Sequence, residues 1–420
     1  MNAAQLVTAP ATPGGAPLLG ADLDSPLLLA DAAVACVDGR IAAVGTTADV
    51  LAAFPESRAL AVVDARGLLV APGFVDAHTH LPFAGTREME FEARSRGESY
   101  AAIAAAGGGI ASSRRALAAV SGDELARQVA ARLSTLLAQG VTTVEAKSGY
   151  GLLWDEERKQ LRALAAAVAS SPIDVVPTFL AAHAVPEEYR ERREAYVATV
   201  VEEMIPAVAR EGLARFCDVW CDDGAFSTEE CRRILDAGKR HGLAAKLHAD
   251  ELGDAGGARL AAEAGALSAD HLLHASDEGL RAMAKAGVVA VLLPGTAFTL
   301  GLSYARARAM IDQGVAVAVA TDWNPGSTMS SSLPLMMTMA ITQMKLTPAE
   351  AWIAVTANAA AAIGEGARAG RIQPGYRADL ALFDIPDYRH VAYHYGHDHV
   401  RLVVVRGAVA HERSDGSRCT

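Results

Sequence analysis

Short apolar runs alternate with segments of helical spacing along most of the chain, from about Leu68 onward. Runs of this length bounded by polar residues predict strands, and the intervening segments, such as 123–139 and 156–169, predict helices. Strands that alternate with helices are expected to run parallel, and a set of eight fits a (β/α)8 barrel. The eight runs end in FVDAHTH, VTTVEAKSGY, VVPTFLAAHA, FCDVWCDDGAF, AAKLHADEL, SADHLLHA, VAVLLPGTA and VAVATDWNPG.

The two ends of the chain share a different pattern, in which short apolar runs are separated by turns. Residues 33–45 form two alternating runs joined by Asp38-Gly39, which predicts a β-hairpin. Residues 370–384 and 402–410 are again short, turn-bounded runs that predict strands. We therefore expect both ends to build one small β domain beside the barrel. The expected limits are 1–70 for its first part, 71–365 for the barrel and 366–420 for its second part.

Two helix starts carry capping signals. Ser227 and Glu230 are spaced as in a capping box, in which the side chain of each residue accepts a hydrogen bond from the backbone N–H of the other. Thr347, followed by Pro348 and Glu350, has the same spacing with proline at the first helical position. This second signal predicts a last helix that runs to about residue 362.

Composition and charge limit the partners. A net charge of −11 argues against nucleic acid or an anionic membrane surface, because both require a basic face. No apolar run approaches the roughly 18 residues that a membrane span needs. No Lys or Arg precedes Arg40, so the positive segment of a secretory signal is missing and we expect a cytoplasmic location. Five cysteines without framework spacing suit a reducing compartment, and Cys217 and Cys221 predict strand packing rather than a metal clip.

Polar residues gather at the ends of the predicted strands, where a barrel has its active site. His78 and His80 follow the first barrel strand, and residues two apart on a strand point to the same side, so both imidazoles can reach one ion. Taken alone, a His-x-His pair is as easily explained by two partly exposed loop histidines. His248 ends the fifth strand and Asp322 the eighth, which completes a set of four ligands. Three imidazoles and one carboxylate suit a single Zn²⁺ or Fe²⁺.

The same mouth offers groups for proton transfer. A bound ion lowers the pKa of its water to about 7 and so supplies hydroxide for attack on a carbonyl carbon. Glu251, three residues after His248, is the candidate that moves the proton, and Asp322 is expected to take part in the reaction as well as in binding the ion. His271 is expected to polarise the carbonyl or share the proton transfer, with Asp270 orienting it. Each of these is an ordinary loop acid or histidine when taken alone, and their shared location favours function.

Longer motifs extend around these residues and cover most of the chain beyond its first thirty or so positions. They are PGFVDAHTHLPFAGTRE from Pro72, GGGI from Gly107, VEAKSGYG from Val144, FLAAHAVP from Phe179, FCDVWCDDGAFS from Phe216, HADE from His248, SADH from Ser268, LLPGTAF from Leu292, ATDWNPGS from Ala320, GYRADLALFD from Gly375 and YHYGHDHV from Tyr393. With these motifs the chain resembles the imidazolonepropionases, a histidine-degrading family of the amidohydrolase superfamily.

The resemblance implies a fold and a reaction. The fold is an α/β protein, a distorted (β/α)8 barrel of amidohydrolase type with a small β-sandwich domain built from both chain ends. The reaction is hydrolysis of the cyclic amide C–N bond of 4-imidazolone-5-propanoate, which gives N-formimidoyl-L-glutamate. The resemblance also implies one divalent ion per subunit and a homodimer.

Roles for single residues follow from the same resemblance. His78, His80, His248 and Asp322 fall on the family's metal ligands, in agreement with the strand-end pattern. Substrate contacts are implied for Arg87, Tyr150, His183, Glu251, Asn324, Gly326 and Ser327. An arginine is a natural partner for the propanoate carboxylate, and Tyr150 with His183 would hold the planar ring.

Two residues raise separate questions. Some amidohydrolases carry a carboxylated lysine that bridges two ions, but we expect Lys147 not to do so, because the resemblance is to a one-ion branch. Trp323 stands where a smaller or different apolar residue is expected, so it could alter the pocket wall.

Two other functions stay open at this point. One is deamination of a ring such as guanine or cytosine by the same metal-bound hydroxide, since fold analogy does not separate these reactions. The other is a barrel that binds a ligand without catalysis. Arg87, the KSGYG motif and the NPGS loop favour the imidazolone with its acidic tail over both.

Overall fold

The computed structural model describes residues 1–98, 102–103 and 107–413. At its centre lies an eight-stranded sheet in which strands consecutive in the sequence are also neighbours in space, in the order β13-β12-β11-β10-β9-β8-β7-β6. All neighbouring pairs are parallel. The strands are β6 Phe74–Asp76, β7 Val141–Lys147, β8 Asp174–Ala182, β9 Phe216–Cys221, β10 Ala244–Ala249, β11 Ser268–His271, β12 Val289–Leu292 and β13 Val317–Val319. The eight predicted strands are thus confirmed.

The first and last strands meet just beyond their carboxyl ends and close the sheet into a barrel. Thr79, after β6, forms a parallel bridge with Trp323, after β13. Asp76 adds a side-chain link, since its buried carboxylate accepts hydrogen bonds from the Thr321 backbone N–H at 3.0 Å and from the Thr321 hydroxyl at 2.6 Å. This closure brings the residues that follow β6 and β13 to the same mouth.

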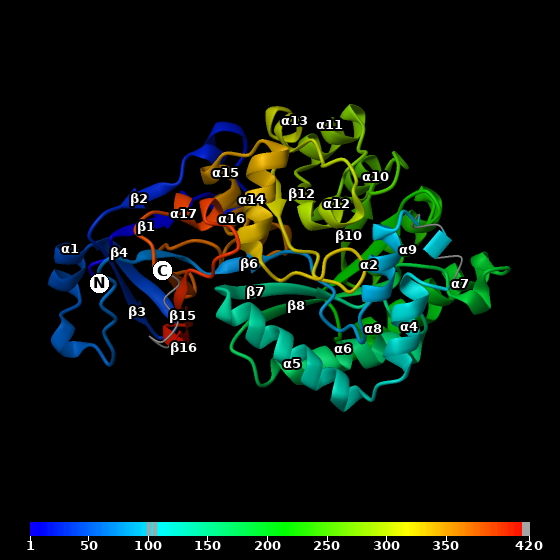
Figure 1. The fold of residues 1–420 in the computed structure, drawn as a ribbon, viewed down its shortest axis with the longest axis horizontal. Coiled ribbons are helices and arrows are strands. Elements are labelled where there is room, and N and C mark those ends of the chain that lie inside the picture. Colours follow the sequence, from blue (N-terminus) through cyan, green and yellow to red (C-terminus); the bar gives the residue numbers. More distant parts are fainter. Residues whose placement is uncertain (99–101, 104–106, 414–420) are drawn as a thin grey trace.

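Helices cover the outside of the barrel (Figure 1). The two predicted helices of the first half are confirmed as α5 Gly122–Ala138 and α6 Trp154–Val168, and they pack against each other. The further α-helices are α1 Thr47–Ala53, α2 Glu88–Ser95, α4 Ile110–Ala118, α7 Arg193–Thr199, α8 Ile205–Glu211, α9 Thr228–Arg240, α10 Gly257–Ala264, α11 Asp277–Ala286, α12 Pro294–Leu300, α13 Ala307–Asp312, α14 Leu333–Met344, α15 Pro348–Ala354, α16 Ala357–Ala362 and α17 Arg389–Tyr393. Short 3-10 turns lie at η1 Pro13–Gly15, η2 Gly20–Asp24, η3 Glu56–Arg58 and η4 Glu187–Tyr189, and a π-helical turn at η5 Val200–Met204.

Both capping signals are confirmed, but the last predicted helix is divided. Ser227 caps α9 and Thr347 caps α15, each in a complete capping box. The helix that begins at Pro348 ends at Ala354, and α16 follows as a separate helix, so the expected single helix to about residue 362 is wrong. Thr356 interrupts it with φ −129° and ψ −92°, outside the helical region.

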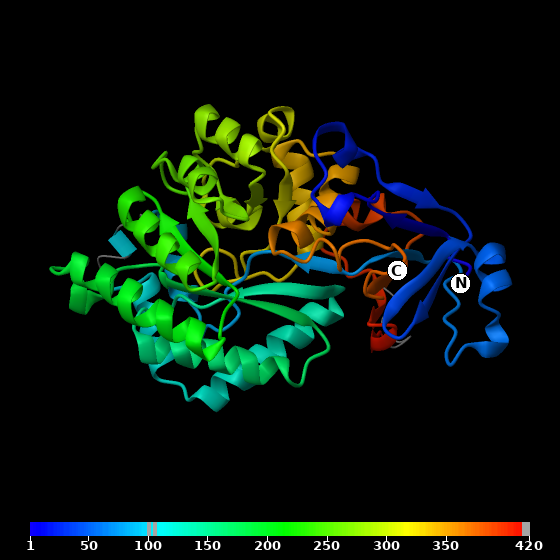
Figure 2. The same cartoon turned by 180° about the vertical axis from the view of Figure 1, so that it is seen from behind.

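The chain ends build the expected small β domain (Figures 1 and 2). Its main sheet has the order β16-β15-β14-β5-β1-β2, with a separate hairpin of β3 and β4. Its strands are β1 Gln5–Thr8, β2 Leu27–Leu29, β3 Ala32–Val37, β4 Arg40–Thr46, β5 Leu69–Pro72, β14 Leu380–Phe383, β15 Val400–Val405 and β16 Ala408–Glu412. The first thirty residues therefore supply two strands of this sheet, while the domain limits near residues 70 and 365 stay a prediction.

In each of two hairpins of this domain, a turn with left-handed backbone joins the two strands. The predicted hairpin at Asp38-Gly39 is confirmed, with φ values of 50° and 76° at the two turn residues. Residues 402–410, expected as one strand, form a second hairpin in which Arg406 and Gly407 have φ values of 49° and 78°. Among the described residues, the helices are too short or too polar to cross a bilayer.

Candidate active site

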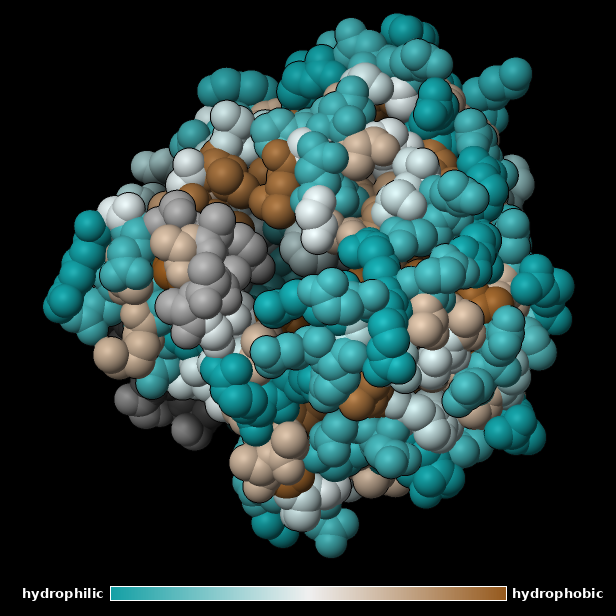
Figure 3. All heavy atoms as spheres, turned by 90° about the vertical axis from the view of Figure 1, so that its right-hand side faces the viewer, coloured by the Kyte–Doolittle hydropathy of each residue, from teal (hydrophilic) through white to brown (hydrophobic). Residues whose placement is uncertain are grey.

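A cavity of about 550 Å³ opens at the carboxyl ends of the barrel strands. Its wall contains eleven of the twelve residues assigned above to metal, catalysis or substrate: His80, Arg87, Tyr150, His183, His248, Glu251, His271, Asp322, Asn324, Gly326 and Ser327. The remaining one, His78, lies fully buried beneath them. The face of the molecule drawn in Figure 3 is largely hydrophilic, with apolar side chains toward its upper left and in smaller groups elsewhere. Apolar residues also border the cavity, among them Phe91 and Phe298, which are more than half exposed.

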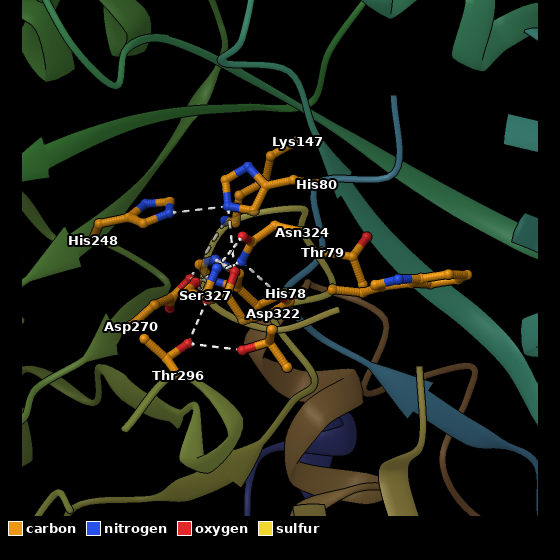
Figure 4. A network of polar contacts seen from close by, with 12 residues as sticks. His78, Thr79, His80, Lys147, His248, Asp270, Thr296, Asp322, Asn324 and Ser327 are labelled. Atoms are coloured by element: carbon orange, nitrogen blue, oxygen red, sulfur yellow. Dashed lines mark hydrogen bonds and ion pairs between the residues drawn. The ribbon is translucent and has the colours of Figure 1, made fainter. Parts of the chain in front are cut away.

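Three histidines and one aspartate converge at the floor of this cavity (Figure 4). His78 Nε2 and His80 Nε2 each lie 3.5 Å from Asp322 Oδ1. His248 Nε2 lies 3.4 Å from His80 Nε2. Atoms bound to one tetrahedral ion at about 2.0–2.1 Å are themselves about 3.4 Å apart. The spacing of these four side chains therefore fits ligands of a single ion.

The protonation state of these atoms, and their missing hydrogen-bond partners in the described part of the chain, fit a metal as well. His78 Nε2 and Asp322 Oδ1 are buried and have no hydrogen-bond partner among the described residues. Burial, reinforced by the neighbouring Lys147, lowers the pKa of His78 well below its usual range, and burial with His183 does the same for His80. Both imidazoles are therefore neutral and present lone pairs, which is the state that binds a metal ion.

Outer polar contacts fix the orientation of three ligands, two of them hydrogen bonds and the third, at His248, an ion-pair contact. His78 Nδ1 lies 2.6 Å from Asp270 Oδ2, and His248 Nδ1 lies 3.1 Å from Asp218 Oδ2. Each carboxylate faces the far nitrogen of its histidine, so Nε2 is turned toward the ion position. Asp322 Oδ2 accepts a hydrogen bond from the Thr296 hydroxyl at 2.6 Å, which leaves Oδ1 directed at the histidines.

Asp270 does not orient His271, contrary to the expectation from the Asp-His dipeptide. Its Oδ2 faces His78 and its Oδ1 accepts a hydrogen bond from the Ser268 hydroxyl at 2.6 Å. The reason is the alternation of the strand, which directs Asp270 into the barrel. His271 reaches the mouth because its backbone turns into the left-handed region, with φ 75°.

Lys147 lies among buried carboxylates, and the expectation that it is not carboxylated stays a prediction. Its ammonium lies 2.7 Å from Asp218 Oδ2 and 2.9 Å from Glu145 Oε2, fully buried. Burial opposes the charge, but the carboxylates of Asp218, Glu145 and Asp270 together raise the pKa of Lys147. The ammonium is thus shared by three carboxylates of the barrel interior.

Glu251 and His271 lie together beside the ligands. Glu251 Oε1 is 3.7 Å from His271 Nδ1. Burial, with the nearby charges of Asp322 and Asp222, raises the pKa of Glu251 well above its usual range, whereas burial lowers that of His271. A raised pKa makes the Glu251 carboxylate a stronger base, which suits it to accept a proton and then return it.

Asp222, which the sequence reasoning did not single out, holds the loop that carries Glu251. Its carboxylate accepts hydrogen bonds from the backbone N–H groups of Glu251, Leu252 and Gly253 at 2.6, 2.7 and 3.1 Å. Because these bonds fix three consecutive peptide units, the position of the Glu251 side chain is set from β9.

Tyr150 and His183 form one side of the cavity. His183 stacks on His80 with 5.1 Å between ring centroids, and its Nδ1 is 2.9 Å from the Gly149 carbonyl oxygen. Burial lowers the pKa of His183 to about 3, so the ring is neutral and donates through Nδ1. His183 also lies close enough to His80 and His248 to share an ion with them, so position alone does not separate ligand from substrate contact.

The KSGYG segment that carries Tyr150 is held by helix α6. Glu157 accepts hydrogen bonds from the backbone N–H groups of Gly149, Gly151 and Leu152, and Gln160 accepts from those of Tyr150 and Gly151. Both acceptors are fully buried. The sequence did not identify these two residues, because the apolar periodicity of a helix does not show which groups a buried polar side chain binds.

Arg87 lies at the start of α2 and packs on the loop that follows β13. A Cβ atom at Gly326 would lie 1.5 Å from Arg87 Nη2, so glycine makes room for the guanidinium. The Asn324 amide oxygen accepts hydrogen bonds from the N–H groups of Gly326 and Ser327 at 2.7 and 2.8 Å, and folds the loop on itself. Trp323 is packed in the hydrophobic core and is not among the lining residues, so the expected effect on the pocket wall is not supported.

Comparison with known proteins places the chain in a family. The sequence model of the Amidohydrolase family matches residues 69–410, and that of an imidazolonepropionase-like composite domain of bacteria matches residues 32–56. The chain is a member of the amidohydrolase family and hence a metal-dependent hydrolase that acts on C–N bonds. Within it, the chain belongs to the imidazolonepropionases.

The relatives that carry this assignment match along nearly the whole chain. Imidazolonepropionase of Geobacillus sp. (strain WCH70) is 51% identical over 409 residues, with 97% of this chain and 96% of the relative covered. That of Clostridium tetani (strain Massachusetts / E88) is 46% identical over 413 residues, with 98% of each chain covered. The match thus extends into the first thirty residues, beyond the motifs quoted above.

Solved structures support the fold alone. Escherichia coli guanine deaminase has a TM-score of 0.71 at 16% identity, with 98% of this chain and 99% of that chain covered. Atrazine chlorohydrolase from Arthrobacter aurescens TC1, complexed with zinc, has a TM-score of 0.71 at 17% identity, with 97% and 94% covered. The predicted barrel with its small β domain is therefore confirmed as an amidohydrolase fold.

Proposed function

We propose that this chain hydrolyses 4-imidazolone-5-propanoate to N-formimidoyl-L-glutamate. The proposal is carried by relatives named imidazolonepropionase that are 46–51% identical over nearly the whole chain. The cavity supports it, because it combines a four-ligand metal position with Arg87, a cation suited to the carboxylate of the substrate tail. Deamination of guanine or cytosine is the weaker alternative, since the guanine deaminase likeness rests on 16% identity.

His78, His80, His248 and Asp322 would hold one divalent ion. When bound, this ion supplies a Lewis acid and a water of lowered pKa. Either Zn²⁺ or Fe²⁺ suits three imidazoles and one carboxylate.

The remaining residues bind the substrate and move the proton. Arg87 binds the propanoate, and Tyr150 with His183 lies against the ring. Glu251 takes a proton from the attacking water as oxygen adds to the ring carbonyl carbon. It then delivers this proton to the ring nitrogen as the C–N bond breaks, which leaves a carboxylic acid on the former carbonyl carbon, and this acid releases its remaining proton to solvent to give the carboxylate. His271, beside Glu251, stabilises the charge that develops on the carbonyl oxygen.

Further members of the loop after β13 complete the substrate contacts. Asn324, Gly326 and Ser327 would support the substrate or product from the side of Arg87, with the loop kept in shape by the Asn324 amide. We also propose a homodimer that acts in the cytoplasm, as expected from the family and from the composition.

The purified protein should consume the imidazolone and leave guanine and cytosine unchanged. His248→Ala should lose both the activity and the bound ion, as measured by elemental analysis beside the assay. Turnover of guanine without turnover of the imidazolone would sink the proposed substrate. Wild-type activity in His248→Ala would sink the proposed ligand set.

A further inference from the structure

A cluster of buried charges lies inside the barrel, directly beneath the candidate metal position. Lys147 stands at its centre, with its ammonium 2.7 Å from Asp218 Oδ2, 2.9 Å from Glu145 Oε2 and 3.4 Å from Asp270 Oδ2. Lys246 lies on β10, two residues before His248, and its ammonium contacts Glu145 Oε2 at 3.0 Å. All five side chains are fully buried. The cluster is therefore shielded from water, where charges interact strongly.

Two of the three carboxylates that touch Lys147 are the outer partners of metal histidines. Asp270 faces His78 Nδ1 at 2.6 Å, and Asp218 faces His248 Nδ1 at 3.1 Å. One ammonium group is thus connected to two of the four candidate ligands through a single intervening side chain each. Figure 4 shows Lys147, Asp270, His78 and His248 around the same point.

We propose that Lys147 is a positioning residue for the metal site, which sets the orientation of His78 and His248 through Asp270 and Asp218. The inference rests on the proposed function, because it takes these histidines as ligands. In dry surroundings the carboxylates of Glu145, Asp218 and Asp270 repel one another, and the ammonium between them holds them together. Without it, Asp218 and Asp270 move apart and the two imidazoles lose the carboxylate contacts that direct Nε2 at the ion.

Lys246 on β10 offers a matched comparison with Lys147 on β7. It carries the same charge and is equally buried, and it contacts Glu145 and the Ala77 carbonyl oxygen at 3.0 and 3.3 Å. Its ammonium is 4.0 Å from Asp270 Oδ2, beyond hydrogen-bond distance. Lys246 and Asp218 are paired along the backbones of β10 and β9, but among the described residues no ion pair within 4.0 Å joins the Lys246 ammonium to the Asp218 carboxylate. Removal of either lysine takes one buried cation from the cluster, but only Lys147 bridges both histidine partners.

The test is the metal affinity of Lys147→Met and Lys246→Met, measured as Zn²⁺ binding by competition with a chelator. Thermal unfolding of both metal-free variants shows whether they are folded and how much stability each has lost. We expect Lys147→Met to bind Zn²⁺ between about 10 and 100 times more weakly than the wild type, as for the loss of other outer partners of metal ligands. Lys246→Met should stay within threefold of the wild type even where its unfolding temperature falls equally.

Other outcomes overturn the inference. An affinity of Lys147→Met within threefold of the wild type, or an equal loss in both variants, would assign Lys147 a purely structural role. If Lys147→Met does not yield folded protein, Lys147→Gln, which keeps a hydrogen-bond donor without the charge, replaces it in the same comparison. A wild type that binds no Zn²⁺ would contradict the proposed metal site itself, which separates that failure from failure of the role of Lys147.

Discussion

Replacement of Gly326 by alanine tests the role of Arg87 without touching the arginine. The new methyl group would lie 1.5 Å from Arg87 Nη2 and 2.2 Å from Cζ, whereas ordinary contacts are 3.4–4 Å. The guanidinium must therefore retreat by about 2 Å, which exceeds the tolerance of a hydrogen bond. Gly326 has no positive φ, so alanine fits its backbone, and the three atoms nearest to the new methyl group all belong to Arg87.

The size of the effect follows from the interaction that is lost. Hydrogen bonds to charged groups contribute about 1.5–3 kcal/mol, which corresponds to an increase in KM of about 10- to 100-fold. We expect kcat to change less than about threefold, because the carboxylate tail lies away from the reacting carbonyl and is bound equally in both states. Steady-state kinetics with the imidazolone measure both constants. Gly122→Ala is the control, since its methyl group would approach only Lys159 Cγ, at 3.9 Å. A KM of Gly326→Ala within twofold of this control would refute the role of Arg87.

Three further predictions concern proton transfer, barrel closure and the ion. Glu251→Gln should lower kcat by about 10²- to 10⁴-fold with unchanged metal content, and near-normal turnover would assign proton transfer to another group. Burial raises the pKa of Asp76 from 3.8 to about 7, so the folded chain holds a proton there that the unfolded chain releases above about pH 4. The unfolding free energy of the metal-free wild type should therefore fall by up to about 4 kcal/mol relative to Asp76→Asn as the pH rises from 4 to 7, and parallel denaturation profiles would contradict this. Removal of the ion should lower the unfolding temperature, because binding to the folded state alone stabilises it by about 2.7 kcal/mol at 100 times Kd, and an unchanged temperature with and without Zn²⁺ would argue against a bound ion.

The barrel and the floor of its site could be predicted because both depend on patterns local in the sequence. Each strand is a short apolar run followed by polar residues, and a parallel barrel collects such strand ends at one mouth. His78, His80, His248 and Asp322 needed only this rule to be brought together. The same alternation of strand residues puts Glu145 and Lys147, two apart on β7, on one side of the strand, and both point inward into the charged cluster.

What the sequence left open depends on contacts between distant segments. The partner of Asp270 is His78, 192 positions away, and no local pattern selects it over the adjacent His271. The support of the Tyr150 loop by Glu157 spans only six positions, but the helical pattern does not show which backbone groups a buried carboxylate binds. The division between α15 and α16 occurs at Thr356, whose propensity alone does not end a helix.

The residues proposed to bind the metal and those proposed to bind the substrate lie on different parts of the barrel, which affects specificity. The ligand histidines and their partners Asp218 and Asp270 lie on or directly after strands, whereas Arg87, Tyr150 and Ser327 lie in loops or at a helix start. Loops tolerate exchange far better than barrel strands. Guanine deaminase shares the fold at 16% identity, so the fold alone does not select a ring to be hydrolysed. Changes confined to the Arg87 and Gly326 loops should therefore alter which substrate tail binds while the ion stays in place. Changes to the charged cluster should weaken binding of the ion and leave the substrate contacts in place.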